Sequence, residues 1–324
     1  MMQSKQRSLP WQYKVWLGKE RKMKKIDIHV HTRKVHGVPS LAGNVFPTYD
    51  ELRLMYDKLG IEKGVNLPLG MSGPEGSSQI ITNDESYELA SLYPETYYWF
   101  CGVDPRIGGN TPKTDLSYYI NYYKELGARG VGEITANINM DDPRVLNLFH
   151  HCEKCKMPVT IHVGNPGFGS YGLIDETGLR RLEYILQQFP KLIILGHSQR
   201  FWAEISEDCT TESRNGYPPG KVAPGGRVIE LMRRYPNLHG DLSAGSGHNA
   251  VTRDPEFGYA FLEEFQDRLY FGTDFTDPRQ IDHPFAGLSG WMDQAYEGGN
   301  ISRTVYEKVC RKNALQLLER DMTI

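Results

Sequence analysis

Residues 24–32, KKIDIHVHT, form an apolar run that ends in two histidines separated by one valine. The alternation of a β-strand places residues i and i+2 on one face, so His29 and His31 are expected to point the same way. A neutral imidazole is a good ligand for zinc and similar divalent metals. The stretch therefore predicts a buried strand whose end carries half of a metal site, with a chance pairing of histidines as the alternative.

Apolar runs of the same kind recur along the chain, and segments with helical periodicity lie between them. Most runs are nearly continuous in apolar residues, as is typical of parallel strands covered on both faces. The runs begin at Lys25, Lys63, Tyr97, Ala128, Pro158, Lys191, Leu238 and Arg268. The helical segments are residues 49–61, 114–128, 142–157, 175–190, 226–236 and 301–321. This alternation predicts the α/β class and a (β/α)8 TIM barrel, as a single domain over residues 24–324. A doubly wound open sheet is the runner-up, weakened because no G-x-G-x-x-G follows the first run.

Composition narrows the classes of partner. With 324 residues, 39% hydrophobic and 24% charged residues, and a net charge of −3, the chain gives no reason to expect nucleic-acid or membrane binding. Residues 1–23 are basic and lack the apolar core of a secretory signal, so we expect an N-terminal extension there, with a nucleic-acid arm as the minor alternative. The five cysteines are scattered and odd in number, which favours a reducing compartment and a cytoplasmic location.

Polar residues follow the apolar runs at the positions where barrel enzymes carry their chemistry. In a TIM barrel the active site lies at the C-terminal ends of the strands. His29 and His31 end the first run, Glu133 lies near the end of the fourth, and His162 ends the fifth. His197 ends the sixth run and Asp274 the eighth. The sequence therefore predicts that these side chains converge at one rim around a divalent metal.

Each residue type suits a role at such a centre. His29, His31, His162 and Asp274 are predicted metal ligands that leave a position open for water or substrate. Asp274 is the predicted general base, and His197 is expected to orient the water or to act as acid and base. Glu133 either coordinates the first metal, bridges to a second, or orders the surrounding residues.

The motifs together resemble the amidohydrolase superfamily, in particular its amidohydrolase 2 branch of barrel hydrolases and decarboxylases. They are IDIHVH (26–31), VTIH (159–162), LGHS (195–198), FGTD (271–274) and the closing VCRKNALQLLE (309–319). The resemblance implies that His29, His31, His162 and Asp274 bind the catalytic metal. It also implies that His197 ligates a second metal or acts in the chemistry.

One position departs from the pattern of the family. Many binuclear members carry a carbamylated lysine at the end of the fourth strand, where this chain has Glu133. A glutamate there is familiar from TatD-like relatives, so the expected metal count stays open at one or two ions. Zinc is the preferred metal and manganese the alternative, because nitrogen and carboxylate ligands accept both.

Three residues are candidates for substrate binding. Arg33 follows the first run, and Arg200 and Trp202 follow the sixth. An arginine there can clamp a substrate carboxylate, and the Trp202 ring can cover an apolar portion. The alternative is that the arginines pair with acidic neighbours on the rim.

The leading hypothesis is a metal-dependent hydrolase that attacks a carbonyl-centred C–O or C–N bond of a small molecule, such as a lactone, ester or amide. The alternative is a non-oxidative, metal-dependent decarboxylase (a lyase) acting on an aromatic or unsaturated carboxylic acid. A third hypothesis, from another class, is a metal-binding barrel scaffold without catalysis. The oligomeric state stays open, with a homo-oligomer among the options.

Overall fold

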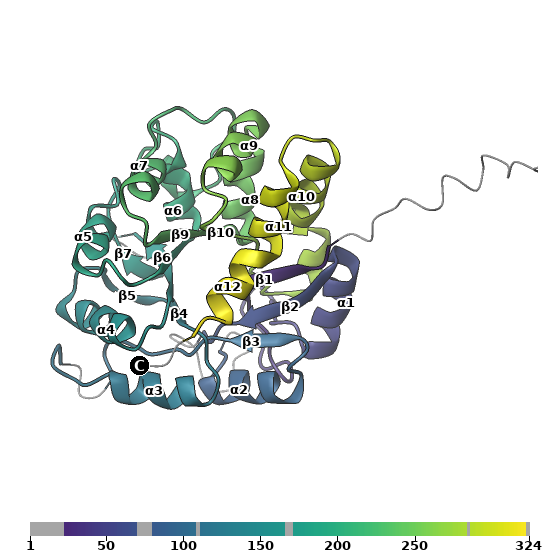
Figure 1. Cartoon of the computed structure of the whole chain (residues 1–324). Coiled ribbons are helices and arrows are strands. Elements are labelled where there is room, and N and C mark those ends of the chain that lie inside the picture. Colours follow the sequence, from purple (N-terminus) through teal and green to yellow (C-terminus); the bar gives the residue numbers. More distant parts are fainter. Residues whose placement is uncertain (1–22, 70–79, 108–110, 166–170, 284–285, 322–324) are drawn as a thin grey trace, which may run out of the picture.

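The computed structural model describes residues 23–69, 80–107, 111–165, 171–283 and 286–321. Nearly all of the predicted N-terminal extension, residues 1–22, therefore lies outside the described residues. Parallel strands form an inner ring, and helices surround them (Figure 1). The barrel strands are β1 (Lys25–Val30), β2 (Ile61–Asn66), β3 (Tyr97–Trp99), β4 (Val131–Ile134), β6 (Val159–Gly164), β8 (Ile194–His197), β9 (Leu238–Asp241) and β10 (Leu269–Tyr270). These correspond one by one to the predicted apolar runs.

The ring closes through two parallel bridges. The sheet β1-β2-β3 is continued by a bridge between Cys101 and Val131, which joins β3 to β4. The order then runs β4, β6, β8, β9, β10, and a bridge between Val30 and Phe275 returns to β1. This closure confirms the (β/α)8 barrel and excludes the open doubly wound sheet. Two short strands, β5 (Ala136–Asn139) and β7 (Gly172–Ile174), pair with each other beyond the ends of β4 and β6.

The helices cover the outside of the ring. They are α1 (Tyr49–Leu59), α2 (Asn83–Leu92), α3 (Ser117–Glu125), α4 (Pro143–Lys154), α5 (Arg180–Gln188), α6 (Gln199–Trp202), α7 (Arg227–Arg234), α8 (Ala244–Thr252), α9 (Pro255–Glu264), α10 (Gly287–Glu297), α11 (Arg303–Glu307) and α12 (Asn313–Leu318). A π-helical turn, Lys308–Lys312, joins α11 to α12. Ala314, Leu317 and Leu318 of α12 pack with barrel residues such as Ile26 and Tyr270.

Helix starts follow local sequence signals. Thr48 and Glu51 form a capping box at α1, and Asp142 caps α4 with Pro143 as its first residue. Helices α2, α6, α8, α9 and α10 were not predicted. Helix α6 has only four residues, and the hydrophobic periodicity of the other four is weaker than that of α5 or α7. Within the described residues no helix is both long and apolar enough to cross a membrane.

Strand β1 departs from strict alternation just before the histidines. Asp27 accepts a hydrogen bond of 2.9 Å from the Tyr56 hydroxyl on α1 and one from the Thr273 hydroxyl. Asp27 therefore lies on the helix side of the strand, although its spacing from His29 predicts the same face. The register of the β1–β2 pairing shifts between Asp27 and Val30, and such an irregularity turns the following side chains.

His239 provides a test of how the barrel responds to acid. Its Nδ1 lies 2.8 Å from the Tyr270 hydroxyl on the neighbouring strand. Burial, with the charges of Arg268 and Arg320, lowers the pKa of His239 from 6.5 to about 3. Between these values the unfolded chain binds a proton that the folded protein does not. The contribution to stability is therefore complete above pH 6.5 and is lost as the pH falls toward 3.

We predict that His239→Gln has a shallower acid dependence of stability than the wild type. From neutral pH to about pH 5, the free energy of unfolding should fall by about 2 kcal/mol less in the variant. Urea unfolding at both pH values measures this difference. Equal acid dependence in the two proteins would contradict it.

Candidate metal centre

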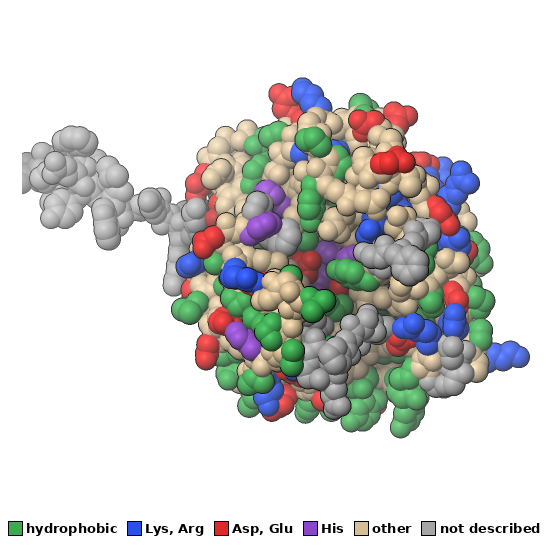
Figure 2. All heavy atoms as spheres, turned by 180° about the vertical axis from the view of Figure 1, so that it is seen from behind, with side chains coloured by type: hydrophobic (Ala, Val, Ile, Leu, Met, Phe, Trp, Pro, Cys, Tyr) green, Lys and Arg blue, Asp and Glu red, His purple; other side chains and the backbone are tan. Residues whose placement is uncertain are grey.

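The six residues predicted from strand ends lie at one end of the barrel. Figure 2 shows histidine and acidic side chains at the bottom of a hollow in the centre of this face. Four histidines of the cluster are at most 4% exposed: His29, His31, His162 and His197. Glu133 is 8% exposed. The Asp274 side chain is the most accessible, at 19%. The predicted convergence of distant residues is therefore present in the fold.

His29 and His31 face each other through the same ring nitrogen. Their Nε2 atoms are 3.0 Å apart. The Nδ1 of His29 lies 2.7 Å from the Asp241 carboxylate, and the Nδ1 of His31 lies 2.9 Å from the Leu67 carbonyl. Because carboxylate and carbonyl oxygens only accept, each Nδ1 carries the proton. In the neutral form of both rings, the Nε2 lone pairs therefore point toward each other.

Two carboxylates point at the same place. Asp274 Oδ1 lies 3.4 Å from His31 Nε2 and 3.6 Å from His29 Nε2. Glu133 Oε2 lies 3.8 Å and 4.0 Å from the same two atoms. Four electron-rich atoms thus surround one small volume.

The carboxylates of the cluster are ionised. Burial opposes their charge, but the surrounding imidazoles outweigh it and lower the pKa of Glu133 to about 2. The pKa of Asp274 is likewise held well below its usual value, against burial, chiefly by His29 and His197. Asp241 behaves in the same way. With the imidazoles in the neutral form that binds metals, these three buried negative charges need a compensating cation.

The donor set fits a divalent cation. Among the described residues, two groups can converge on an ion: His29, His31 and Asp274, and His29, Glu133 and His197. Facing lone pairs and ionised carboxylates repel one another unless a cation lies between them, and nitrogen with carboxylate oxygen is a ligand set that zinc and manganese accept. The chemistry of the side chains therefore fits the predicted metal.

His162 lies beside this cluster and contacts Glu133. Its Nδ1 is 2.6 Å from Glu133 Oε1, and its ring packs 4.2 Å from that of Tyr171, measured between centroids. It belongs to neither converging group. In this structure His162 orients the glutamate, and its role as a direct ligand stays a prediction.

His197 connects the cluster to its surroundings. Its Nε2 lies 3.6 Å from Asp274 Oδ2 and 3.8 Å from Glu133 Oε1. Its Nδ1 lies 3.0 Å from the Ser243 hydroxyl and 3.4 Å from Asp241 Oδ2. Burial opposes protonation, but contacts with Asp241 and Asp274 raise the pKa of His197 well above its usual value. The ring can thus hold a proton next to Asp274.

Asp241, at the end of β9, was not among the predicted site residues. Its Oδ2 faces the Nδ1 atoms of both His29 and His197, and its Oδ1 accepts from the Ser243 backbone N–H at 2.9 Å. A carboxylate behind a metal-binding histidine fixes the tautomer and the orientation of the ring. The strand-end rule that selected Asp274 applies equally to the run LHGD, so the signal was present in the sequence.

The backbone turns sharply where strands end at the cluster. Asp274, Ser198 and Ala244 have φ angles of 53°, 104° and 61°, which L-residues adopt rarely. The Asp274 backbone N–H donates to the His29 carbonyl at 2.7 Å. Strained backbone of this kind persists where the surroundings hold it in place, commonly at functional sites.

The three predicted substrate residues have different surroundings. Arg33 forms an ion pair with Glu85 on α2, with 3.2 Å between Arg33 Nε and Glu85 Oε2. This contact matches the alternative prediction, in which arginines of the rim pair with acidic neighbours. Trp202 is 2% exposed and donates from its indole to the Asp241 carbonyl at 2.8 Å. Its ring supports the wall from behind, which corrects the expectation that it covers substrate. Arg200 is half-buried and donates to the Asn215 side chain at 3.0 Å.

The family model for amidohydrolases matches residues 88–320. This match covers most of the chain, so the protein belongs to the amidohydrolase family, in the branch that the motifs indicated. Members of this family are metal-dependent enzymes, and hydrolases and decarboxylases occur among the proteins of similar structure. A comparison with curated proteins gives no match.

Solved structures share the fold at low identity. An uncharacterised TIM-barrel protein from Bordetella bronchiseptica aligns with a TM-score of 0.60 and 18% identity, over 92% of this chain and 99% of the other. A 5-carboxyvanillate decarboxylase from Novosphingobium aromaticivorans with bound manganese gives 0.57 and 15%, over 94% and 99%. A probable 2-pyrone-4,6-dicarboxylic acid hydrolase from Acinetobacter baumannii gives 0.55 and 13%, over 92% and 100%. At these identities the likeness shows the barrel alone.

We predict that Asp241→Asn weakens metal binding. An amide in place of this carboxylate no longer holds the His29 tautomer as firmly, and loss of such a partner costs about 10- to 100-fold in metal affinity. Competition with a chelator, followed by metal analysis, measures the change.

Asp175→Asn is the matched control, because Asp175 is also fully buried but caps the start of α5 through the Arg181 and Leu182 backbone N–H groups. Metal affinity should stay unchanged in this control. Equal metal affinity in Asp241→Asn and the wild type would contradict the role of Asp241.

Proposed function

We propose that the protein is a metal-dependent hydrolase that cleaves a carbonyl-centred C–O or C–N bond in a small-molecule lactone, ester or amide. The observation that supports this most strongly is the pair of Nε2 atoms 3.0 Å apart, facing the ionised Asp274 and Glu133. Such a set holds a Lewis acid next to a base that is accessible to solvent. A purely structural metal would not require the accessible Asp274 beside a second proton-holding residue, so this pair argues against a non-catalytic scaffold.

His29, His31 and Asp274 would hold the ion, with Glu133 as a further ligand. When bound, a divalent cation lowers the pKa of a coordinated water to about 7 and polarises the substrate carbonyl. We infer a single ion, because His29 offers only Nε2 and both converging groups include this residue. Zinc is our first candidate and manganese the second.

Asp274 and His197 would handle the proton. Asp274 accepts a proton from water as the water oxygen bonds to the carbonyl carbon. His197, which already holds a proton on Nε2, donates it to the departing oxygen or nitrogen as the C–O or C–N bond breaks. Asp274 Oδ2 lies 3.6 Å from His197 Nε2, close enough to return the proton taken from water to the ring through a small movement. The products are an acid and an alcohol or amine.

Arg200 is the proposed contact for a substrate carboxylate. Among the described residues its guanidinium donates to an amide oxygen of Asn215 rather than to an acid. Burial lowers the pKa of Arg200, with the nearby Arg214 adding to this effect, so a bound anion would relieve unfavourable charge.

The second candidate is a non-oxidative decarboxylase of an aromatic or unsaturated acid. The raised pKa of His197 favours it, because a charged imidazole can protonate the carbon from which carbon dioxide departs. In either case the substrate is a small molecule.

All five cysteines are free thiols, which supports a reducing compartment such as the cytoplasm.

We predict that zinc-reloaded protein releases acid from a panel of lactones, esters and amides, and that chelated protein does not. Acid release is followed by pH indicator, and carbon dioxide from a parallel panel of aromatic carboxylic acids by a coupled assay. Carbon dioxide without hydrolysis would replace the hydrolase by the decarboxylase. Turnover that survives complete metal removal would contradict both.

We further predict that Asp274→Asn lowers kcat/KM by about 10²- to 10⁴-fold, since an amide cannot accept the proton. Asp277→Asn is the control, because this nearby aspartate caps a 3₁₀ turn and pairs with Arg279. Activity close to wild type in Asp274→Asn, with metal content verified, would rule out Asp274 as the base.

A further inference from the structure

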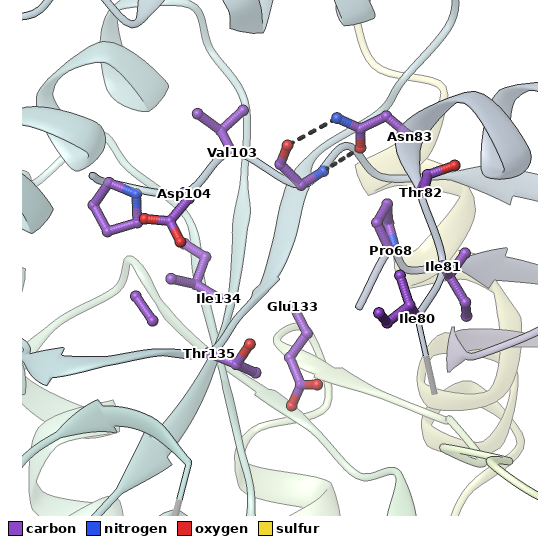
Figure 3. A pocket seen from close by; sticks show the side chains of 13 residues that line it. Pro68, Ile80, Ile81, Thr82, Asn83, Val103, Asp104, Glu133, Ile134 and Thr135 are labelled. Atoms are coloured by element: carbon purple, nitrogen blue, oxygen red, sulfur yellow. Dashed lines mark hydrogen bonds between the residues drawn. The ribbon is translucent and has the colours of Figure 1, made fainter. Parts of the chain in front are cut away.

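A cavity of about 220 Å³ opens beside Glu133, between the ends of β2, β3 and β4 (Figure 3). It extends away from the histidines toward the start of α2. Pro68, Ile80 and Ile81 form one wall, and Val103 and Ile134 the other. The proposed hydrolysis uses Glu133 but leaves this space without a role.

The walls are apolar, and most of their polar groups are already engaged. The Asn83 amide oxygen accepts a hydrogen bond from the Gly102 N–H at 2.7 Å, and the amide nitrogen donates to the Gly102 carbonyl at 2.9 Å. The Asp104 carboxylate is held by Arg106 at 2.6 and 2.8 Å. The Thr82 hydroxyl caps α2. Among the described residues that line the cavity there is no lysine or arginine.

Thr135 is different. It lines the cavity, is 4% exposed, and its hydroxyl has no hydrogen-bond partner within the described part of the chain. Leaving a buried hydroxyl unpaired is unfavourable, because it loses its hydrogen bonds to water without replacement. A hydroxyl can either donate or accept, so a single polar atom of a ligand can satisfy it.

Size and charge limit what fits. A cavity of roughly 150 Å³ is enough for a benzene ring, so this space accommodates one substituted six-membered ring. The described lining holds two carboxylates, those of Glu133 and Asp104, and no lysine or arginine that could pair with a bound anion. A carboxylate therefore does not belong in this cavity.

We infer that the cavity is a specificity subsite for an uncharged, ring-sized apolar part of the substrate, whose one polar atom pairs with Thr135. This inference rests on the proposed function, since it assigns a binding role to the space beside the proposed metal centre. Thr135 is then a specificity-determining residue rather than a participant in the proton transfer.

Binding of phenol and toluene to the zinc-loaded protein tests this directly. Phenol carries the ring and one uncharged polar atom, and toluene the ring alone. We expect phenol to bind about fivefold more tightly than toluene to the wild type, the value of one ordinary hydrogen bond. Thr135→Val should remove this preference while toluene binding is kept, and Thr135→Ser should restore it. Calorimetry or ligand-observed NMR gives the affinities.

Variants that fill the cavity locate the site. Val103→Phe and, independently, Ala136→Leu should abolish phenol binding with metal content and Tm close to wild type. Unchanged phenol binding in both filled variants, or equal phenol preference in Thr135→Val and wild type, would overturn the inference. If the zinc-loaded wild type binds phenol but hydrolyses none of the lactones, esters and amides, the proposed hydrolase is overturned instead. The two failures are therefore distinguishable.

Discussion

The site depends on one carboxylate, that of Asp241, which holds two imidazoles at once. Its Oδ2 lies 2.7 Å from His29 Nδ1 and 3.4 Å from His197 Nδ1. Both rings therefore have their Nδ1 atoms engaged from behind, and only Nε2 faces the cluster. Without this anion the tautomer of the neutral His29 ring would not be fixed, and this buried ring could present a proton where a lone pair is needed. Behind Asp241, the Trp202 indole fixes its backbone carbonyl. The residues behind the cluster thus set the orientation of the candidate metal ligands.

Closure of the barrel sets the distances among residues far apart in sequence. The bridge between Val30 and Phe275 joins the first and last strands, and the Asp274 N–H reaches the His29 carbonyl directly across this seam. Asp27 reinforces the seam by accepting from Thr273 through both its backbone N–H and its hydroxyl. The ionised Asp274 is therefore held near the imidazoles by backbone hydrogen bonds. This rigidity matters because carboxylates and imidazole lone pairs repel one another when no cation lies between them, so the backbone must hold them close together.

The sequence alone predicted the barrel strands and the convergence of His29, His31, His197 and Asp274, because strand ends in a parallel barrel all lie on one rim. It could not show which partner a long side chain would choose. Arg33 turns to Glu85 and Trp202 into the core, and both choices depend on helices that strand periodicity does not position. Asp241 was not predicted, although it ends a predicted strand and the strand-end rule that selected Asp274 applies to it equally. The contact between His162 and Glu133 depends on rotamers, which spacing does not encode.

The two sides of the centre differ in character, and this bears on how a substrate would lie. Toward β8, Arg200 offers a cation next to an amide. Toward β2, β3 and β4, the cavity is apolar with one unpaired hydroxyl. A molecule with an anionic end and an uncharged ring would then span the centre and present the bond between them to Asp274. The same orientation would serve hydrolysis, where the proton goes to a departing heteroatom, and decarboxylation, where it goes to carbon. The polarity of the site thus constrains the pose more tightly than it constrains the reaction.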